Sequence, residues 1–376
     1  MIPRTVITPE LFAQLKEMNI QKEETEEKVQ APAEEQEETD ELCVPNEDFF
    51  NTTASDYEAF NEKAWNKGDG YSAPNFPIFS EKMEGLESGL YMFAGESNHG
   101  KSAIALNLMY DFCTNPDNKL FGIYFSLDDT SQEIIPRLIA MNELIPISVA
   151  SKPQRYQNII NTGDPCGMQY EEMLQKREHG LETLKELSKH FKVVDGTKIK
   201  CAEQILDYCV KAQRYVKAYD PEWDIMVCID SLSDMRFASK HFRTDKELND
   251  FIAKETKKWA VEILDIPIFG TLHLRKIDQR SRPGIDDVKE SGEYVYEASA
   301  LFLVYNDVSR NKQAASIYQV DDTTHEKIPV IELDWAKNKK SSYKGRTYHT
   351  FMSNYSKVTE CSKERMDRFN QLIYSA

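Results

Sequence analysis

GLYMFAGESNHGKSAIALNLMYDF, residues 89–112, is the stretch of this sequence that decides the fold. It contains the pattern G-x-x-x-x-G-K-[ST] between an apolar run and a segment of helical periodicity. Gly95 and Gly100 allow a tight turn whose backbone N–H groups point at a phosphate, Lys101 adds a positive charge, and Ser102 offers a hydroxyl to Mg²⁺. The helix that follows directs its N-terminus at the same anion. The stretch therefore predicts a nucleotide-binding loop, whose expected binding residues are Gly95, Glu96, Ser97, Asn98, His99, Gly100, Lys101 and Ser102.

Apolar and helical runs alternate along the chain around this loop. Strands are expected at 89–94, 120–127, 191–194, 225–229, 266–272, 300–305, 329–333 and 346–351. Helices are expected at 102–113, 130–143, 170–190, 201–218 and 244–264. This alternation predicts an α/β fold with a mostly parallel central sheet and helices on both faces. The last three apolar runs are closely spaced, so they predict antiparallel strands at one edge.

The acidity of the chain is concentrated at its N-terminus. Residues 1–50 carry a net charge of −10 out of −17 for all 376 residues, so nucleic-acid binding by the remainder is not excluded. The acidic stretch 21–42 has few apolar residues and predicts disorder. We divide the chain into an acidic tail with a short helix at 8–19 (1–45), a helical linker (46–74), an α/β domain (75–358) and a C-terminal helix and tail (359–376). The helix at 8–19 is either a docking peptide for a partner or a frayed terminus.

Composition bounds the compartment. No apolar run approaches the ~20 residues that span a membrane, and the N-terminus lacks the pattern of a secretory signal. Seven cysteines occur without a C-x-x-C pair, which favours neither a zinc site nor a disulfide framework. We therefore expect a cytoplasmic protein that does not insert into membranes.

Two aspartates follow the strand at 120–127. A carboxylate at the carboxyl end of a strand beside the phosphate loop can polarise an attacking water, and Asp128 is our candidate for this role. The alternative is that Asp128 and Asp129 both cap the next helix, as we expect for Asp129. Thr130 and Glu133 have the spacing of a capping box.

A third aspartate, Asp230, ends the buried strand in WDIMVCIDSLSDM (223–235). An apolar strand that ends in Asp is common, but this one follows the phosphate loop in a chain of alternating strands and helices. Its carboxylate is expected to hold Mg²⁺ together with the Ser102 hydroxyl.

Basic segments follow two of the central strands. IPIFGTLHLRK (266–276) places His273 where it can contact the γ-phosphate, although a structural histidine is the alternative. In an acidic protein, two basic loops after central strands indicate contact with a nucleic-acid backbone, with a solvated surface as the alternative. The candidate DNA-binding residues are Arg236, Lys240, Arg243, Arg275, Lys276, Arg280 and Arg282.

A basic hairpin closes the α/β region. In ELDWAKNKKSSYKGRTYHTF (332–351) a strand, a basic turn and another strand follow one another. Cations on such an edge hairpin can reach a neighbouring copy's γ-phosphate, as an arginine finger does. The cations of this hairpin are Lys337, Lys339, Lys340 and Lys344.

These segments in this order resemble the motor domain of DnaB-type ring helicases, a RecA-like family, over residues 75–358. The resemblance rests on GLESGLYMFAGESNHGKSAIALNL (85–108), YFSLDDTSQEIIPRLIA (124–140), IMVCIDSLSDM (225–235), TLHLRK (271–276), DVKESGEYVYEASALFLVYND (287–307) and AKNKKSSYKG (336–345). It implies that Asp128 is the catalytic carboxylate and Asp230 the Mg²⁺ ligand. It also implies that His273 is the γ-phosphate sensor of the phage-like branch, and that Lys337 and Lys339 act in trans.

The resemblance implies a RecA-like P-loop NTPase with an antiparallel edge, which uses ATP and Mg²⁺ to move on single-stranded DNA and unwind duplex in replication. It further implies a homo-hexamer from a bacteriophage or plasmid-like system, active in the host cytoplasm, with a primase or loader bound through the N-terminal tail. Two other functions remain open: a RecA-like recombinase or regulatory ring ATPase without unwinding, and a non-catalytic ATP-binding assembly or loader factor. A GTPase is disfavoured because NKKS (338–341) lacks the Asp of N-K-x-D.

Overall fold

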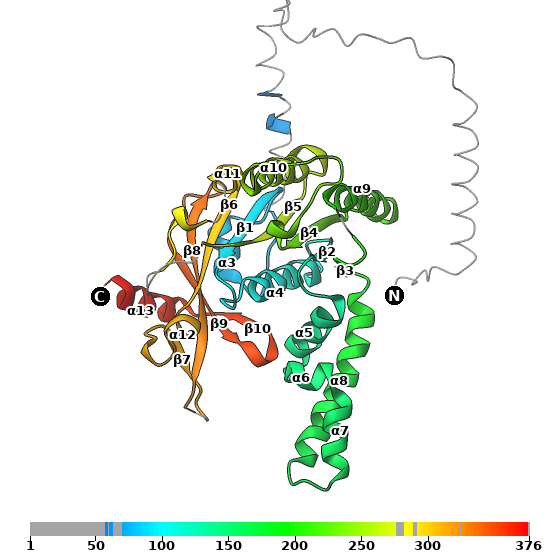
Figure 1. Ribbon diagram of the computed structural model, residues 1–376, viewed down its shortest axis with the longest axis vertical. Helices are drawn as coiled ribbons and strands as arrows, with labels where there is room; N and C mark the ends of the chain where they lie inside the picture. The colour runs from blue at the N-terminus through cyan, green and yellow to red at the C-terminus, as the bar shows by residue number, and fades with distance from the viewer. Residues whose placement is uncertain are drawn as a thin grey trace, which may run out of the picture. The chain divides into compact units, whose positions relative to one another are not determined.

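A ten-stranded sheet forms the centre of the unit Gly68–Ala376 (Figure 1). The computed structural model describes residues 57–58, 60–62, 70–199, 201–275, 282–288, 292–323 and 325–374. The expected helix at 8–19 and the acidic stretch lie outside these residues. Of the expected helical linker, residues 57–58 and 60–62 are helical, and they belong to the separate unit Met1–Lys67.

The strands run in the spatial order β10-β9-β8-β6-β1-β5-β4-β2-β3, and β7 pairs with β8. Their bounds are β1 Gly89–Gly95, β2 Leu120–Ser126, β3 Phe191–Asp195, β4 Asp224–Asp230, β5 Pro267–His273, β6 Ala300–Asn306, β7 Tyr318–Val320, β8 Lys327–Asn338, β9 Arg346–Met352 and β10 Lys357–Glu360. The six strands from β6 to β3 in this order are mutually parallel. Strands β8, β9 and β10 add an antiparallel edge, so the fold is the α/β fold that the sequence predicts.

One of the three strands expected in the antiparallel edge has a different place. β6 pairs with β1 in parallel and with β8 in antiparallel orientation. It therefore belongs to the parallel core and joins the two parts of the sheet. Residues 274–299 connect β5 to β6, which is long enough for a parallel crossover, and they include the short helix α11, Gly292–Glu297.

Helices cover both faces of the sheet. The helices in chain order are α3 Pro77–Met83, α4 Lys101–Thr114, α5 Ser131–Glu143, α6 Ile147–Ser151, α7 Pro153–Asn161, α8 Gly167–Leu187, α9 Ala202–Tyr219, α10 Asp245–Lys258, α11, α12 Asp307–Asn311 and α13 Lys363–Tyr374. Alternate residues of β1 face opposite sides, as the pleat of a strand requires. Tyr91 and Phe93 pack with α3, α4 and α5, whereas Leu90, Met92 and Ala94 pack with α9 and α10.

Both ends of the described unit extend past the limits 75 and 358. Tyr71 forms a β-bridge with Leu86, and the backbone N–H of Ser72 donates to the side chain of Asn118. At the other end, Met366 and Phe369 of α13 pack in a small core. These segments therefore pack as part of the same body as the sheet.

Candidate active site

The phosphate loop joins β1 to α4 and requires glycine at two positions. Gly100 has φ 94°, and a Cβ there would lie 2.6 Å from Ile331 Cδ1. Gly95 has an ordinary φ, but a Cβ there would lie 2.8 Å from the carbonyl oxygen of Val304. Gly95 is therefore needed for space, and Gly100 is needed for both space and backbone conformation.

Lys101 points back over the loop. Its side chain is nearly buried, and Nζ donates a hydrogen bond to the carbonyl oxygen of Glu96 at 2.9 Å. Burial lowers the pKa of Lys101, and attraction to Asp230, Asp128 and Glu96 opposes that shift. The ammonium group is therefore poorly solvated, and an opposite charge such as that of a phosphate would stabilise its protonated form.

Asp230 is held by two hydroxyl groups at the end of β4. Tyr124 Oη donates to one carboxylate oxygen at 2.5 Å, and Thr271 Oγ1 donates to the other. The neighbours come from β2 and β5, which flank β4 in the sheet. Both oxygens are thereby fixed in direction, as second-shell hydrogen bonds fix a metal ligand.

The Ser102 hydroxyl and the Asp230 carboxylate are oxygen donors of the kind that Mg²⁺ prefers, and phosphate oxygens and water would complete such a site. Mg²⁺ in phosphate-transfer sites usually takes one or two protein oxygens and keeps several waters. Among the described residues, no group of three or more His, Cys, Asp or Glu forms a metal cage by itself. One hydroxyl and one oriented carboxylate match a Mg²⁺ site in which phosphate oxygens and water supply the remaining ligands.

Asp128 lies two residues beyond the end of β2, among other charged groups. Burial raises the pKa of Asp128, and the carboxylates of Asp234, Asp129 and Asp230 raise it further, whereas His273 lowers it. His273 ends β5 opposite Gly95 of β1. The structure thus brings Asp128, Asp230, His273 and the phosphate loop to the carboxyl ends of adjacent strands.

Asp129 does not cap the next helix, contrary to expectation. Its carboxylate pairs with Arg137 at 2.8 Å. Thr130 is the N-cap of α5, and it forms the expected capping box with Glu133. The carboxylate that accepts from the backbone N–H of Ser131 belongs to Asp195 of β3. The parallel neighbour strand supplies the acceptor, so Asp129 is left to bind Arg137, which lies nearly two turns inside the helix.

A second segment supports the phosphate loop, and sequence reasoning missed it. In α12, the Arg310 guanidinium pairs with Glu96 at 2.7 Å, and Ser309 Oγ donates to the carbonyl oxygen of Asn98 at 3.2 Å. The His99 ring packs edge-on against Tyr305, with centroids 5.5 Å apart. The sequence signal was Asn306 directly after a strand run, since Asn is a strong N-cap residue and does cap α12 here.

The hairpin lysines lie at the other end of the sheet. In the β6–β8 register Lys337 pairs with Leu301, while Gly95 of the phosphate loop pairs with Val304. Three residues of strand separate these positions by about 10 Å, and Lys339 lies further away still. Within one copy, therefore, the structure does not bring Lys337 and Lys339 to the phosphate loop.

The loop after β4 carries three exposed cations, Arg236, Lys240 and Arg243, which we name the β4-loop cations. Glu203 of α9 fixes this loop by accepting hydrogen bonds from the backbone of Ala238 and Ser239. Although burial acts against it, hydrogen bonding to Ser239 and Ala238 lowers the pKa of Glu203 to about 2. The Lys240 ammonium lies 3.8 Å from the centroid of the Phe251 ring.

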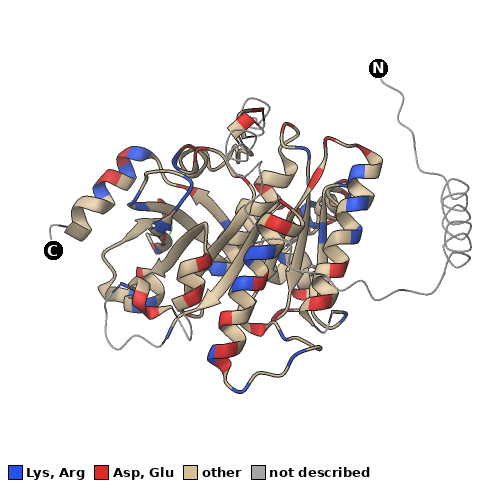
Figure 2. Ribbon diagram, turned by 90° about the horizontal axis from the view of Figure 1, so that it is seen from above, with Lys and Arg blue, Asp and Glu red and all other residues tan. Residues whose placement is uncertain are grey.

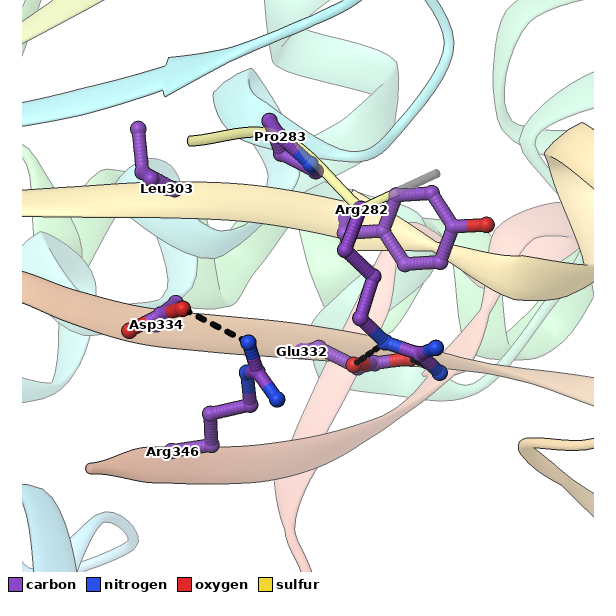
Figure 3. Close-up of a pocket in the computed structure, with 7 residues that line it drawn as sticks. Arg282, Pro283, Leu303, Glu332, Asp334 and Arg346 are labelled. Atoms are coloured by element: carbon purple, nitrogen blue, oxygen red, sulfur yellow. Dashed lines mark hydrogen bonds and ion pairs between the residues drawn. The ribbon is translucent and has the colours of Figure 1, made fainter. Parts of the chain in front are cut away.

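The basic residues after β5 have different surroundings. Arg275 is exposed, and its backbone N–H donates to the carbonyl oxygen of Asp287. Lys276 and Arg280 lie outside the described residues. Arg282 forms a two-bond ion pair with Glu332 of β8, at 2.7 and 2.9 Å (Figure 3). That pair occupies the Arg282 guanidinium, and contact of Arg282 with DNA stays a prediction.

Figure 3 shows a second ion pair beside the first, in a small pocket that both pairs line. Arg346 of β9 binds Asp334, which is two residues from Glu332 on the same strand. The two pairs differ in burial: the Glu332 side chain is 1% exposed and the Asp334 side chain 31% exposed. The Arg282 guanidinium carbon also lies 5.2 Å from the centroid of the Tyr305 ring.

Charge over the rest of the surface is mixed. Lys and Arg are interspersed with Asp and Glu on the helices and loops (Figure 2). Any polyanion contact therefore depends on local loops such as the one after β4.

No helix among the described residues is both long and apolar enough to cross a membrane.

Comparisons with known proteins show which family and which solved structures this chain resembles. Residues 73–360 match the profile of the DnaB-like helicase C-terminal domain. The replicative DNA helicase DnaB of Rickettsia typhi is 27% identical over 243 residues, which cover 61% of this chain and 44% of that protein. The chain therefore matches less than half the length of this relative.

Two solved structures share the fold. The first, described as an ATPase domain, aligns with a TM-score of 0.63 at 20% identity, over 85% of this chain and 100% of that one. A DnaB-like replicative helicase, studied with its interactions with primase, aligns with a TM-score of 0.63 at 20% identity, over 93% of this chain and 74% of that one.

Proposed function

Because the chain belongs to the family of DnaB-like helicases through their C-terminal domain, we propose that it is an ATP-driven motor that moves along single-stranded DNA and unwinds duplex during replication. One observation carries the proposal furthest. The phosphate loop, Asp128, Asp230 and His273 converge at the carboxyl ends of adjacent parallel strands, where ligands bind in open α/β sheets.

The chain's own residues divide the work of nucleotide binding. The phosphate loop would hold the phosphates of ATP with its backbone N–H groups and the Lys101 ammonium. Ser102 and Asp230 would hold Mg²⁺, which neutralises phosphate charge when bound. Tyr124 and Thr271 keep the Asp230 carboxylate in one orientation, so the site is organised before the nucleotide arrives.

Asp128 is the proposed base for hydrolysis. It would accept a hydrogen bond from the attacking water and direct it at the γ-phosphate. Burial and the neighbouring carboxylates raise the pKa of Asp128, which makes it a better proton acceptor than an isolated aspartate. His273 lies close enough to influence that carboxylate, so it can respond to the presence of the γ-phosphate.

DNA contacts are proposed for the loops that follow β4 and β5. The β4-loop cations and Arg275 are exposed at the carboxyl end of the sheet, and Lys276 and Arg280 extend the basic sequence. These loops continue the strands that carry Asp230 and His273, so a change at the phosphates acts on the base of each loop. Binding would be mainly to phosphates and would weaken with salt.

The active site is proposed to form between copies of the chain. Lys337 and Lys339 lie at the opposite end of the sheet from their own phosphate loop, so they would act on a nucleotide held by a second copy. A closed ring, which we propose to be a hexamer, gives every copy such a neighbour. We also propose a phage-like origin and a primase or loader as partner of the N-terminal tail.

Single-stranded DNA-stimulated ATP turnover tests the proposal. Wild-type protein should turn over ATP faster with oligonucleotide and Mg²⁺, while Lys101→Ala and Asp128→Asn should abolish turnover. Asp128→Asn should retain nucleotide binding, because the phosphate loop is intact. Wild-type protein as inert as both variants would favour a non-catalytic assembly factor. Turnover without strand separation would favour a recombinase or regulatory ATPase.

A further inference from the structure

Three lysines from two separate parts of the chain converge on residues 295–299, which form the end of α11 and the connection to β6. Lys337 and Lys339 come from the end of β8 and the turn after it, and Lys257 comes from the end of α10. We name these three residues the lysine cluster. Helices α10 and α11 lie side by side at this end of the unit (Figure 1).

The two hairpin lysines bind the carboxyl end of α11. Lys337 Nζ donates to the carbonyl oxygens of Val295 and Tyr296, at 2.5 and 2.6 Å. Lys339 Nζ donates to the Tyr296 carbonyl at 3.3 Å. The carbonyls at a helix C-terminus attract cations, so these bonds hold both ammonium groups at one place on the surface.

Lys257 reaches the same place from α10. Its Nζ and Ser299 Oγ are 3.1 Å apart, and the carbonyl oxygen of Ser299 accepts from the backbone N–H of Lys339 at 2.8 Å. Ser299 therefore fixes the position of Lys257 relative to the hairpin. The next lysine of α10, Lys258, is exposed and forms no part of this arrangement.

The cluster has an excess of positive charge. Burial, together with the neighbouring charges of Lys339 and Lys257, lowers the pKa of Lys337 to about 8, with Glu297 acting in the opposite direction. Burial and the charges of Lys339 and Lys340 likewise lower the pKa of Lys257. Lys340 is itself paired with Glu87 at 3.2 Å. An anion that bound the cluster would relieve this repulsion.

The position of the cluster indicates which anion it would bind. The cluster lies near the start of β6, whereas the phosphate loop of the same copy lies at the carboxyl ends of the parallel strands. The loops after β4 and β5, to which we assign DNA, also follow those carboxyl ends. The phosphate must therefore come from another molecule. A single lysine cannot make the two parallel hydrogen bonds of an arginine, whereas several converging lysines can supply several donors to one phosphate group.

We propose that Lys257 is a third cation of the site that binds the triphosphate held by a second copy of the chain, alongside Lys337 and Lys339. This inference rests on the proposed function, because it requires ATP to bind at the phosphate loop of the neighbouring copy. It assigns a role in phosphate binding to a residue outside the hairpin.

The first test compares Lys257→Ala with Lys258→Ala. Loss of one charged hydrogen bond to the reacting phosphate should lower kcat for ATP on the order of tenfold. Lys258→Ala should stay within about twofold, since surface substitutions usually have small effects. Lys257→Arg should restore most of the rate because it keeps the charge. Thermal unfolding of each variant separates a loss of folding from a loss of catalysis.

Mixed assemblies identify the copy on which Lys257 acts. Lys101→Ala copies lack a working phosphate loop but keep the lysine cluster, whereas Lys257→Ala copies have the reverse defect. Mixing them should give more turnover than the sum of the two separate preparations, because some interfaces combine two intact halves. A role of Lys257 in the nucleotide site of its own copy would not produce this gain.

Several outcomes would overturn the inference. Wild-type turnover in Lys257→Ala would remove Lys257 from the site, as would a loss that mixing does not restore. If Lys257→Ala lowered the affinity for single-stranded DNA in the absence of nucleotide as much as it lowers ATP turnover, Lys257 would be assigned to DNA phosphate instead. If wild-type protein shows no ATP turnover, the proposed function fails and this inference falls with it. Normal wild-type turnover with an unaffected Lys257→Ala variant contradicts this inference alone.

Discussion

Breaking the ion pair between Arg282 and Glu332 should destabilise the protein by an amount that depends on which partner is removed. The Glu332 side chain is 1% exposed and the Arg282 side chain 26% exposed. Removing one partner of a buried ion pair costs about 3–5 kcal/mol when the other charge stays buried. Arg282→Met leaves the carboxylate in that position, so we expect a loss of about 3–4 kcal/mol at neutral pH.

The opposite substitution should cost less. Glu332→Gln keeps an acceptor oxygen at the same place, and the remaining guanidinium can still reach water. We expect a loss of about 1–2 kcal/mol, the value of a hydrogen bond to a charged group. The neighbouring pair of Arg346 and Asp334 is the matched control. The Asp334 side chain is 31% exposed, so Arg346→Met should cost about 1 kcal/mol or less.

The dependence on pH gives a second check. Burial raises the pKa of Glu332, and Arg282 opposes that shift, so removing Arg282 raises the pKa further. A carboxyl whose pKa is higher in the folded state favours folding below its unfolded pKa, and this contribution is lost as pH rises through the folded pKa. The deficit of Arg282→Met should therefore be largest near pH 7.5 and shrink towards pH 5.

Urea unfolding of the four proteins at pH 7.5 and pH 5.5 measures both effects. Equal losses for Arg282→Met and Arg346→Met would contradict the burial argument. A deficit for Arg282→Met that is the same at both pH values would show that Glu332 is not left as a buried carboxylate.

Three further predictions concern nucleotide and DNA. Gly100→Ala should cost about 2–4 kcal/mol and abolish nucleotide binding, because its φ of 94° is strained for alanine and the new methyl would meet a side chain of β8 at 2.6 Å. Gly163→Ala, with φ 73° and no atom within 4 Å of its Cβ, should cost only about 1–2 kcal/mol, and equal losses in urea unfolding would refute this account. ATP turnover should fall in acid at a midpoint pH above about 3.9, the usual pKa of Asp, because the pKa of Asp128 is raised. A stopped-flow pH profile with a lower midpoint would exclude Asp128 as the base. Replacing all three β4-loop cations with alanine should weaken single-stranded DNA binding and reduce the slope of log affinity against log salt by about 2, and an unchanged slope in a fluorescence titration would place the DNA elsewhere.

Local chemistry explains what the sequence predicted well. The residues of the phosphate loop are contiguous, and their glycine positions follow from backbone geometry. The place of Asp230 at the end of a buried strand was recognisable because a run of apolar residues precedes it. The eight expected strands are all present, since each is an apolar run long enough to show its own pattern.

Contacts between distant residues were beyond this reasoning. The hydroxyl of Tyr124 reaches Asp230 only because β2 and β4 are neighbours in a given register. Arg310 reaches Glu96 across more than 200 residues of sequence. Asp195 replaced Asp129 at the start of α5 for the same reason, since a neighbouring strand supplied the acceptor. Such pairings depend on strand order and register, which no local pattern encodes.

Strand separation of a forked DNA duplex tests the central claim most directly. The measurement is the fluorescence of a strand released from a labelled fork, with Mg²⁺ and ATP, for wild-type protein and Asp128→Asn. We predict ATP-dependent release by the wild type and none by the variant, even though the variant still binds nucleotide. Release that is equal in both proteins, or ATP turnover by the wild type without any release, would contradict the account.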